Sequence, residues 1–432
     1  MRSKRYRCSV LSGGITALVI TVLSVAGSAP AIPDADEDGE ECTTVIAVGT
    51  ATVDGKTRTG QNHDGTPWTG QKPSRVVRIT VNEKTGIKTI NELNSCGVAR
   101  QGNGRNPFPG MEGGASTFAD PKEAYVVEYA FAKKDHPHAK DPHEAALASA
   151  RTAKEAVDVC VKELPAGSYH IIGPLRNQAF GQANAYLTPA LLALQSDPAF
   201  SRDRQKRVQD LLRADDPRHG PTVSGASGQI STLYLFSVLR NHEVPWGFDT
   251  TWKFGRQDLG DLCRWSYRGI SRNGDVREIS SDYPDLLSIY WTTAHFPAFS
   301  PFLPFYIGLT SIPPTFADGK TNESDIFREL FHAIAYKMNY ADDVQRFWES
   351  FDLLTVSELE LFETDVKGFM DRGDRKGAEK LLYNFSNRKC ELAVSYAKEL
   401  VKIIVEGRPI TDVRVNTSLP KRPTWEWASS EW

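Results

Sequence analysis

The stretch that decides the fold is Cys42–Asp64, which reads CTTVIAVGTATVDGKTRTGQNHD. Thr43–Val53 is rich in β-branched residues, which favour strands, and it ends at Asp54-Gly55, a pair typical of a hairpin turn. Thr57–Asn62 is then expected to be the return strand. A cysteine therefore opens one arm of a hairpin, and the polar run Gln61-Asn62-His63-Asp64 ends the other.

The residues before Cys42 are expected to lie outside this fold. Residues 1–31 combine a basic start, an apolar run from Ile15 to Ala26 and small residues near the end, which is typical of a secretory signal peptide. A bilayer span needs about 20 apolar residues, so this run is short, and membrane anchoring through it is left open. Residues 32–41 contain six acids and no base, which favours a disordered linker or a propeptide.

Beyond the hairpin, strands and helices are both expected. The expected strands are Arg75–Val81, Ala124–Phe131 and Ser168–Leu187, the last broken at Gly173-Pro174. The expected helices are Pro142–Leu164, Arg202–Arg213 and Ile230–His242, followed by an almost entirely helical region, Asp325–Glu406. Gly407 and Pro409 should end the last helix. The aromatic stretch Tyr290–Ile312 is either an ordered loop on the core or a wall of an apolar pocket.

The composition is that of an ordinary globular chain. Its 432 residues are 40% hydrophobic and 24% charged, with a formal net charge of −3. These values exclude a disordered chain and a strongly basic nucleic-acid binder. The sequons at Asn322, Asn384 and Asn416 fit secretion, or the lumen of the secretory or lysosomal pathway.

The cysteine count indicates an unpaired thiol. Six cysteines occur, and five remain if Cys8 leaves with the signal segment. An odd number in a secreted chain leaves at least one thiol without a disulfide. The partner of Cys96 is left open among Cys160, Cys263 and Cys390.

Cys42 has the most informative chemistry. If the chain is cleaved between Glu41 and Cys42, the cysteine carries both a thiol and a free α-amine. An α-amine has a pKa of about 7.7 to 8.0 and can act as a general base near neutrality. One residue would then supply both the nucleophile and its base.

Ordered motifs from Cys42 to Gly407 resemble those of the N-terminal nucleophile (Ntn) cysteine hydrolases, above all the dipeptidase/secernin family. Relatives of that family include penicillin V acylases, bile salt hydrolases and acyl-CoA:6-aminopenicillanic acid acyltransferases. After the hairpin and Gly60–Asp64, the resembling segments are Asn94–Val98 with Gly102-Asn103, Arg151–Ala156, Leu239–His242, Trp291–Tyr306 and Lys376–Val401.

The resemblance implies an α+β fold, the four-layer αββα sandwich of Ntn hydrolases. One domain would cover residues 42–432, and residues 325–407 would be mostly helical. The substrate would be a short peptide or an N-acyl amino acid. The resemblance implies no cofactor, metal or nucleic-acid partner, and a homo-oligomer is left open.

The resemblance also implies roles for particular residues. Cys42 would attack an amide carbonyl, its α-amine would take the thiol proton, and Asp64 would orient that amine. Asn184 and Asn103 would donate to the oxyanion, where charge develops in the transition state. Gln61 occupies a position where many relatives have arginine.

These features together favour a secreted or endomembrane cysteine amidase that resembles a dipeptidase. The glutamine at position 61 is frequent in the acyltransferase-like branch, so an N-acyl amide hydrolase or acyltransferase is the alternative enzyme. A non-catalytic, secernin-like interaction protein with the same fold is the alternative from another class.

Other polar clusters have simpler interpretations. The group His136, His138, Asp141 and His143 is expected to be a solvated loop that leads into a helix cap, rather than a metal site. Arg202, Arg204 and Arg207 could bind a substrate carboxylate, but a solvated helix face is the preferred interpretation. On a strand, His63 should point away from Asp64, because neighbouring side chains alternate between the two faces.

Overall fold

The computed structural model describes residues 42–65, 77–104, 110–132, 142–183, 186–193, 198–212, 230–242, 262–263, 265–266, 269–317 and 324–413. The chain divides into two compact units, Met1–Asp38 and Gly39–Trp432, and all described residues belong to the second. The expected signal segment and propeptide, residues 1–41, lie outside the described residues, as do the sequons at Asn322 and Asn416.

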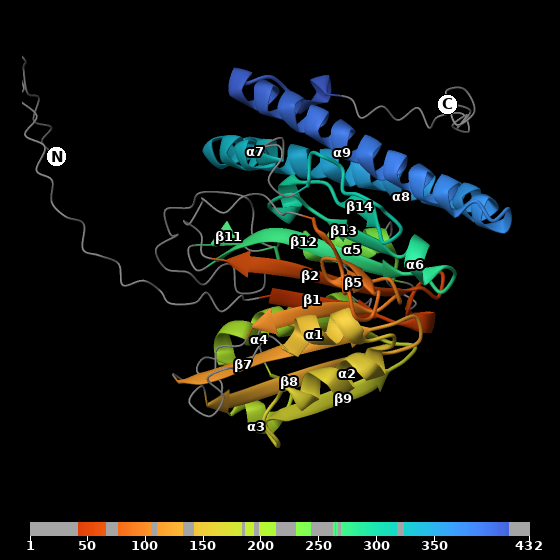
Figure 1. Ribbon diagram of the computed structural model, residues 1–432. Helices are drawn as coiled ribbons and strands as arrows, with labels where there is room; N and C mark the ends of the chain where they lie inside the picture. The colour runs from red at the N-terminus through yellow and green to blue at the C-terminus, as the bar shows by residue number, and fades with distance from the viewer. Residues whose placement is uncertain are drawn as a thin grey trace, which may run out of the picture. The chain divides into compact units, whose positions relative to one another are not determined.

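The described part of the chain is a mixed α+β structure with two antiparallel sheets (Figure 1). The strands of the first sheet, in spatial order, are β10 (Ala179–Gln182), β1 (Cys42–Ala47), β2 (Thr57–Gly65), β12 (Gly269–Ile279), β13 (Ile289–Thr292) and β14 (Leu303–Tyr306), with β11 (Trp265–Ser266) paired to β12. The second sheet runs in chain order through β3 (Ile79–Val81), β4 (Lys88–Ile90), β5 (Leu93–Asn94), β6 (Ala99–Gly104), β7 (Met111–Ala119), β8 (Ala124–Ala132) and β9 (Tyr169–Leu175). The expected α+β class is thereby confirmed.

The helices lie on both sheets and at one end of the chain. Those of the described residues are α1 (Pro142–Ser149), α2 (Ala153–Lys162), α3 (Pro189–Leu192), α4 (Pro198–Leu212), α5 (Thr232–Leu239), α6 (Pro284–Leu287), α7 (Asp325–Tyr336), α8 (Ala341–Asp371) and α9 (Arg375–Glu406). No helix among these is both long enough and apolar enough to cross a lipid bilayer.

The hairpin expected at the start of the fold is present, but its first strand is shorter than expected. It covers Cys42–Ala47 rather than Thr43–Val53, and a 3-10 helix, Gly49–Ala51, follows it. Strands β1 and β2 pair antiparallel, with Val45 opposite Gly60, and every residue of β1 is buried. Gly60 is required by this close packing, because a Cβ there would lie 2.7 Å from Cγ2 of Val45. Strand β2 extends past the expected end at Asn62, so that His63 and Asp64 both belong to it.

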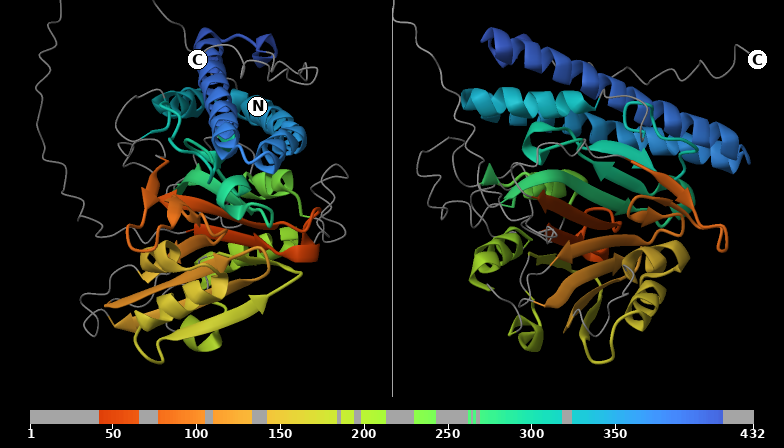
Figure 2. Two further views of the ribbon diagram at one scale, coloured as in Figure 1. Left: turned by 45° about the vertical axis from the view of Figure 1, so that its right-hand side comes forward. Right: turned by 60° about the vertical axis from the view of Figure 1, so that its left-hand side comes forward.

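The two sheets pack against each other through β6, which contacts β1 and β2. Helix α4 contacts β1 and β10, and α5 contacts β2 and β12, whereas α2 contacts β7 and β8 (Figures 1 and 2). Successive side chains of β2 point to opposite faces of the first sheet. Asn62 donates to the Leu239 carbonyl of α5, and its neighbour Gln61 donates to the Gly102 carbonyl of β6.

The expected C-terminal helical region is confirmed. Helices α7, α8 and α9 pack together, and α9 contacts the edge strand β14 (Figures 1 and 2). Helix α9 ends at Gly407, whose φ of 74° is the left-handed conformation typical of a glycine cap. The sequon at Asn384 lies within α9, where its half-buried side chain is a poor acceptor for a glycan.

Other expected elements also differ in the structure. The single helix over Pro142–Leu164 is two helices, because the Thr152 hydroxyl accepts from the Glu155 amide at 3.1 Å and caps a new one. Strand β9 continues through Gly173-Pro174, since an edge strand tolerates proline. The stretch Tyr290–Ile312 contains most of β13 and all of β14, rather than being a loop.

A buried charge cluster ties the start of β2 to β12. Lys56 Nζ lies 2.6 Å from Oε1 of Glu278, and the Thr232 hydroxyl of α5 donates to Oε2 at 2.5 Å. Arg58 Nε lies 3.6 Å from the same Oε2. Burial alone would raise the pKa of Glu278, but Arg58 and Lys56 outweigh it and lower this pKa to about 2.

Replacing Glu278 should therefore change how stability depends on pH. A carboxyl whose pKa falls from 4.5 to about 2 on folding stabilises the fold above pH 4.5, and this contribution is lost as the pH falls toward 2. It amounts to about 3 kcal/mol at 1.36 kcal/mol per pKa unit. Urea unfolding of Glu278→Gln between pH 7 and pH 3 should show lower stability at pH 7 and a flatter pH dependence than the wild type. Asp343→Asn, at an exposed helix pair, is the control, and an unchanged pH dependence in Glu278→Gln would contradict this account.

Candidate active site

Cys42 is the first residue of β1, and its side chain is a buried free thiol. In the antiparallel register it lies opposite His63 on β2. Along its other edge, β2 pairs with β12, where Asp64 lies opposite Ser271 and Gln61 lies opposite Asp275. The polar end of β2 therefore lies between the strand that carries the cysteine and β12.

The side chains of this hairpin divide between two faces. Residues directly opposite in an antiparallel pair share a face, so Cys42 lies on the His63 side, toward the second sheet. Thr43 and Asp64 lie on the other side, toward α4. The prediction that His63 points away from Asp64 is confirmed, because Asp64 pairs with Arg204 of α4 on one face, whereas His63 lies beside Glu92 and Asp275 on the other.

Asp64 is held by two buried donors. Arg204 Nη2 donates to Oδ2 of Asp64 at 2.8 Å and to the Thr43 hydroxyl at 2.6 Å. The Ser271 hydroxyl donates to Oδ1 of Asp64 at 2.7 Å. Asp64 is the residue that the resemblance assigns to orienting the amine. It is thus linked, through the guanidinium of Arg204, to Thr43, the residue after Cys42.

The interpretation of α4 as a solvated arginine face was wrong for two of its three arginines. Arg204 and Arg207 are buried, and Arg207 Nε donates to the Asn241 side chain at 2.9 Å. The side chain of Arg202 lies outside the described residues. Helix α4 packs on β1 and β10 with apolar residues such as Val208 and Leu211, and this packing draws the adjacent guanidinium groups inward.

Gln61 connects the first sheet to the strand that carries Asn103. Its amide nitrogen donates to the carbonyl of Gly102 on β6. Asn103 follows on the same strand, opposite Ala115 of β7, but its side chain lies outside the described residues. The other oxyanion candidate, Asn184, also lies outside them. The structure thus brings together Cys42, Gln61 and Asp64 on adjacent strands, with the backbone of Asn103 beside Gln61.

Glu128 is a buried residue that sequence reasoning missed. Its carboxylate accepts from Gln182 Nε2 at 2.6 Å, from the Leu187 amide at 2.8 Å and from the Thr188 amide at 2.9 Å. Gln182 itself lies opposite Thr44 on β1. Glu128 thus fixes residues on both sides of Asn184. The feature of the sequence that could have identified Glu128 is its place as the lone acid in an otherwise uncharged strand, AYVVEYAFA.

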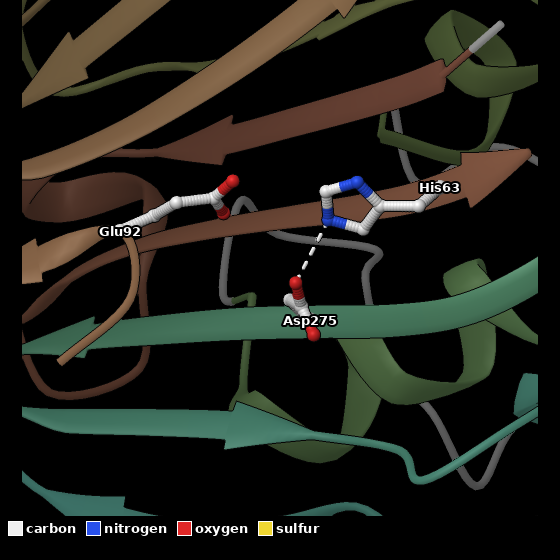
Figure 3. A group of neighbouring side chains, drawn as sticks. All are labelled: His63, Glu92 and Asp275. Atoms are coloured by element: carbon white, nitrogen blue, oxygen red, sulfur yellow. Dashed lines mark hydrogen bonds and ion pairs between the residues drawn. The ribbon is translucent and has the colours of Figure 1, made fainter. Parts of the chain in front are cut away.

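A second group of charged residues surrounds His63 (Figure 3). His63 Nε2 lies 2.8 Å from Oδ2 of Asp275 on β12. Glu92, from the turn between β4 and β5, brings its carboxylate near both, so that one ligand atom from each lies within 4.8 Å of the others. Residues of these types could hold a metal ion. Arg277 already pairs with Glu92 and lies 3.4 Å from Oδ2 of Asp275, which favours a hydrogen-bonded charge cluster over a metal site.

The metal interpretation of His136, His138, Asp141 and His143 falls on side chains outside the described residues. Among the described residues, Cys96 and Cys390 are also free thiols, so no disulfide is described for Cys96. Burial raises the pKa of both thiols, for Cys390 far above its usual range. Neither is therefore suited to act as a nucleophile near neutral pH.

Comparison with known proteins adds no relative: the chain matches no protein-family model and no curated protein. Function must therefore be inferred from the residues of the site.

The buried pair of Arg204 and Asp64 gives a test of this geometry. Arg204→Met should lower the free energy of unfolding by about 3–5 kcal/mol, because it leaves a buried carboxylate without its cation. Adding Asp64→Asn should recover much of that loss. Urea unfolding of the single and double variants measures both effects.

Lys206→Met is the matched control for Arg204→Met. Lys206 lies on the same helix, and its side chain, 73% exposed, pairs with Asp210. Its removal should change stability by less than about 1 kcal/mol. Equal losses in Arg204→Met and Lys206→Met would contradict a buried ion pair at Asp64.

Proposed function

We propose that the chain is a cysteine hydrolase of the N-terminal nucleophile type, which matures by cleavage before Cys42 and hydrolyses short peptides. The observation that carries the proposal is the position of Cys42. It opens a buried strand between β10 and β2, directly after an acidic segment, and the polar residues Gln61–Asp64 lie on β2. A secreted or lumenal location belongs to the same proposal, from the expected signal segment.

The order of the packed elements supports the fold that this proposal requires. Two antiparallel sheets face each other through β6, β1 and β2. Helices α4 and α5 contact the first sheet, and α1 and α2 contact the second. Neighbouring apolar residues of β8 pack on opposite faces of the second sheet. Val127 packs with α2, and Val126 packs with the core of the first sheet. This is the arrangement expected of an αββα sandwich.

The proposed reaction begins when the α-amine of the mature Cys42 takes the thiol proton. The thiolate attacks the amide carbonyl of the substrate, and negative charge develops on the carbonyl oxygen. The α-amine passes this proton to the leaving amine of the substrate, and water then hydrolyses the thioester. Asp64, itself fixed by Arg204 and Ser271, would hold the amine in place, and Asn103 and Asn184 are the proposed oxyanion donors.

Gln61 favours a second enzymatic candidate. Its buried amide donates to the Gly102 carbonyl, so a neutral group occupies the position where dipeptidase relatives have a cation. A neutral site has less attraction for a substrate carboxylate, which favours N-acyl amides or acyl transfer. A panel of dipeptides, N-acyl amino acids and N-acyl amides without a carboxylate separates the activities, and turnover of none of them would favour an interaction protein.

The proposed base can be tested by moving the amine alone. In a chain that begins with one glycine before Cys42, the thiol stays in place but Cys42 no longer has a free amine. Turnover of the best substrate in the panel should fall by about 100- to 10,000-fold, the usual contribution of a general base. Removing the glycine with an aminopeptidase should restore it. Unchanged turnover in the extended chain would mean that a side chain is the base.

The proposed nucleophile can be tested by alkylation. In the mature chain, iodoacetamide should label Cys42 first, and activity should fall in step with that label. Cys390 should stay unlabelled, because burial raises the pKa of its thiol. Mass spectrometry of the peptides measures both. Cys42→Ala should be folded and inactive, whereas Cys96→Ala should keep its activity. Normal turnover in folded Cys42→Ala would refute the proposed enzyme.

A further inference from the structure

The proposed cleavage before Cys42 needs a base of its own. Until the bond between Glu41 and Cys42 is broken, the nitrogen of Cys42 belongs to a peptide bond and cannot accept a proton. The α-amine proposed for turnover is therefore not available for maturation. If Cys42 cleaves this bond itself, a side chain on the thiol's side of β1 must take the proton.

His63 lies on the thiol's side of the hairpin. It is directly opposite Cys42 in the register of β1 and β2, where side chains share a face and their Cβ atoms lie about 4.5–5.5 Å apart. The sulfur is one bond from its Cβ, and Nδ1 of the imidazole is two bonds from its own. The register therefore places the thiol and the imidazole on one face of neighbouring strands, where a side-chain rotation or one bridging water molecule would connect Sγ with Nδ1.

Asp275 fixes the imidazole in the form that accepts at Nδ1. Nε2 of His63 lies 2.8 Å from Oδ2 of Asp275 (Figure 3). A neutral histidine that donates from Nε2 has its lone pair on Nδ1. Asp275 is fixed in turn by the Thr292 hydroxyl and by Asn273 Nδ2, which lies 3.2 Å from Oδ1.

The charges around His63 would stabilise the imidazolium that forms when it takes the thiol proton. Asp275 and Glu92 contribute two negative charges, and Arg277, which contacts both carboxylates, contributes one positive charge. Among these described contacts, a proton on His63 makes the group neutral. The side chains of His63, Asp275 and Arg277 are buried, so their interaction with the imidazolium is screened little by water.

We propose that His63, positioned by Asp275, is the base for self-cleavage of the bond between Glu41 and Cys42. This inference rests on the proposed function only in that Cys42 is the nucleophile. His63 Nδ1 takes the thiol proton, and the thiolate attacks the Glu41 carbonyl carbon. The new C–S bond forms as the C–N bond breaks, and the imidazolium returns its proton to the leaving nitrogen. Water then hydrolyses the thioester, which yields the Glu41 carboxylate, the Cys42 thiol and the free α-amine.

The test follows cleavage of the purified full chain by intact mass, and it needs no substrate. The wild type should lose the residues before Cys42, and Cys42→Ala should keep them. His63→Gln should slow cleavage at least 100-fold. His295→Gln is the matched control, because His295 is a half-buried histidine whose ring packs against Phe331. It should cleave at the wild-type rate.

Asp275→Asn is the second variant, and it decides the outcome if His63→Gln does not fold. It should slow cleavage at least tenfold. It should also shift the acid limb of the cleavage pH profile to lower pH, since loss of the negative charge destabilises the imidazolium. A purely structural role for Asp275 would lower thermal stability without this shift.

Wild-type cleavage rates in a folded His63→Gln chain, or an unshifted profile in Asp275→Asn, would overturn the proposal. So would a purified wild-type chain that stays intact. If cleavage depends on His63 but no substrate of the panel is hydrolysed, this inference holds and the proposed hydrolase activity fails.

Discussion

The register of β1 against β2 is the constraint on which the candidate site depends. With Cys42 opposite His63, alternation directs the thiol and the imidazole toward the second sheet and sends Asp64 toward α4. A slip of one residue would exchange the two faces and separate Cys42 from His63. Gly60 helps to prevent that slip, because Val45 packs where the side chain of any other residue would lie.

Buried charges surround this hairpin on both faces. Asp64 pairs with Arg204 on one face, and Asp275 lies between His63 and Arg277 on the other. Burying ions costs several kcal/mol each, and well-packed apolar side chains would often stabilise the fold as well or better. Stability alone therefore does not account for such a concentration of charge next to a single buried cysteine. A role in orienting and transferring protons accounts for it better.

The sequence predicted features that depend on local patterns, and it missed those that depend on distant partners. The hairpin, the opposite faces of His63 and Asp64 and the C-terminal helices follow from alternation and helical periodicity. Arg204 looked solvated because its partner Asp64 is 140 residues away in the chain. Asp275 could not be assigned to His63 either, since only the pairing of β12 with β2 brings them together.

Two bases for one thiol have a physical rationale. Two carboxylates and one guanidinium lie around His63, and they would stabilise the imidazolium that forms when it takes the thiol proton. The proposed cleavage would occur once in each chain, so its base would not have to pass a proton repeatedly. Repeated turnover instead needs a base that takes and releases its proton near neutral pH, and an α-amine has that property. In the proposed scheme, the register places the first base opposite Cys42 from the start, and cleavage would create the second.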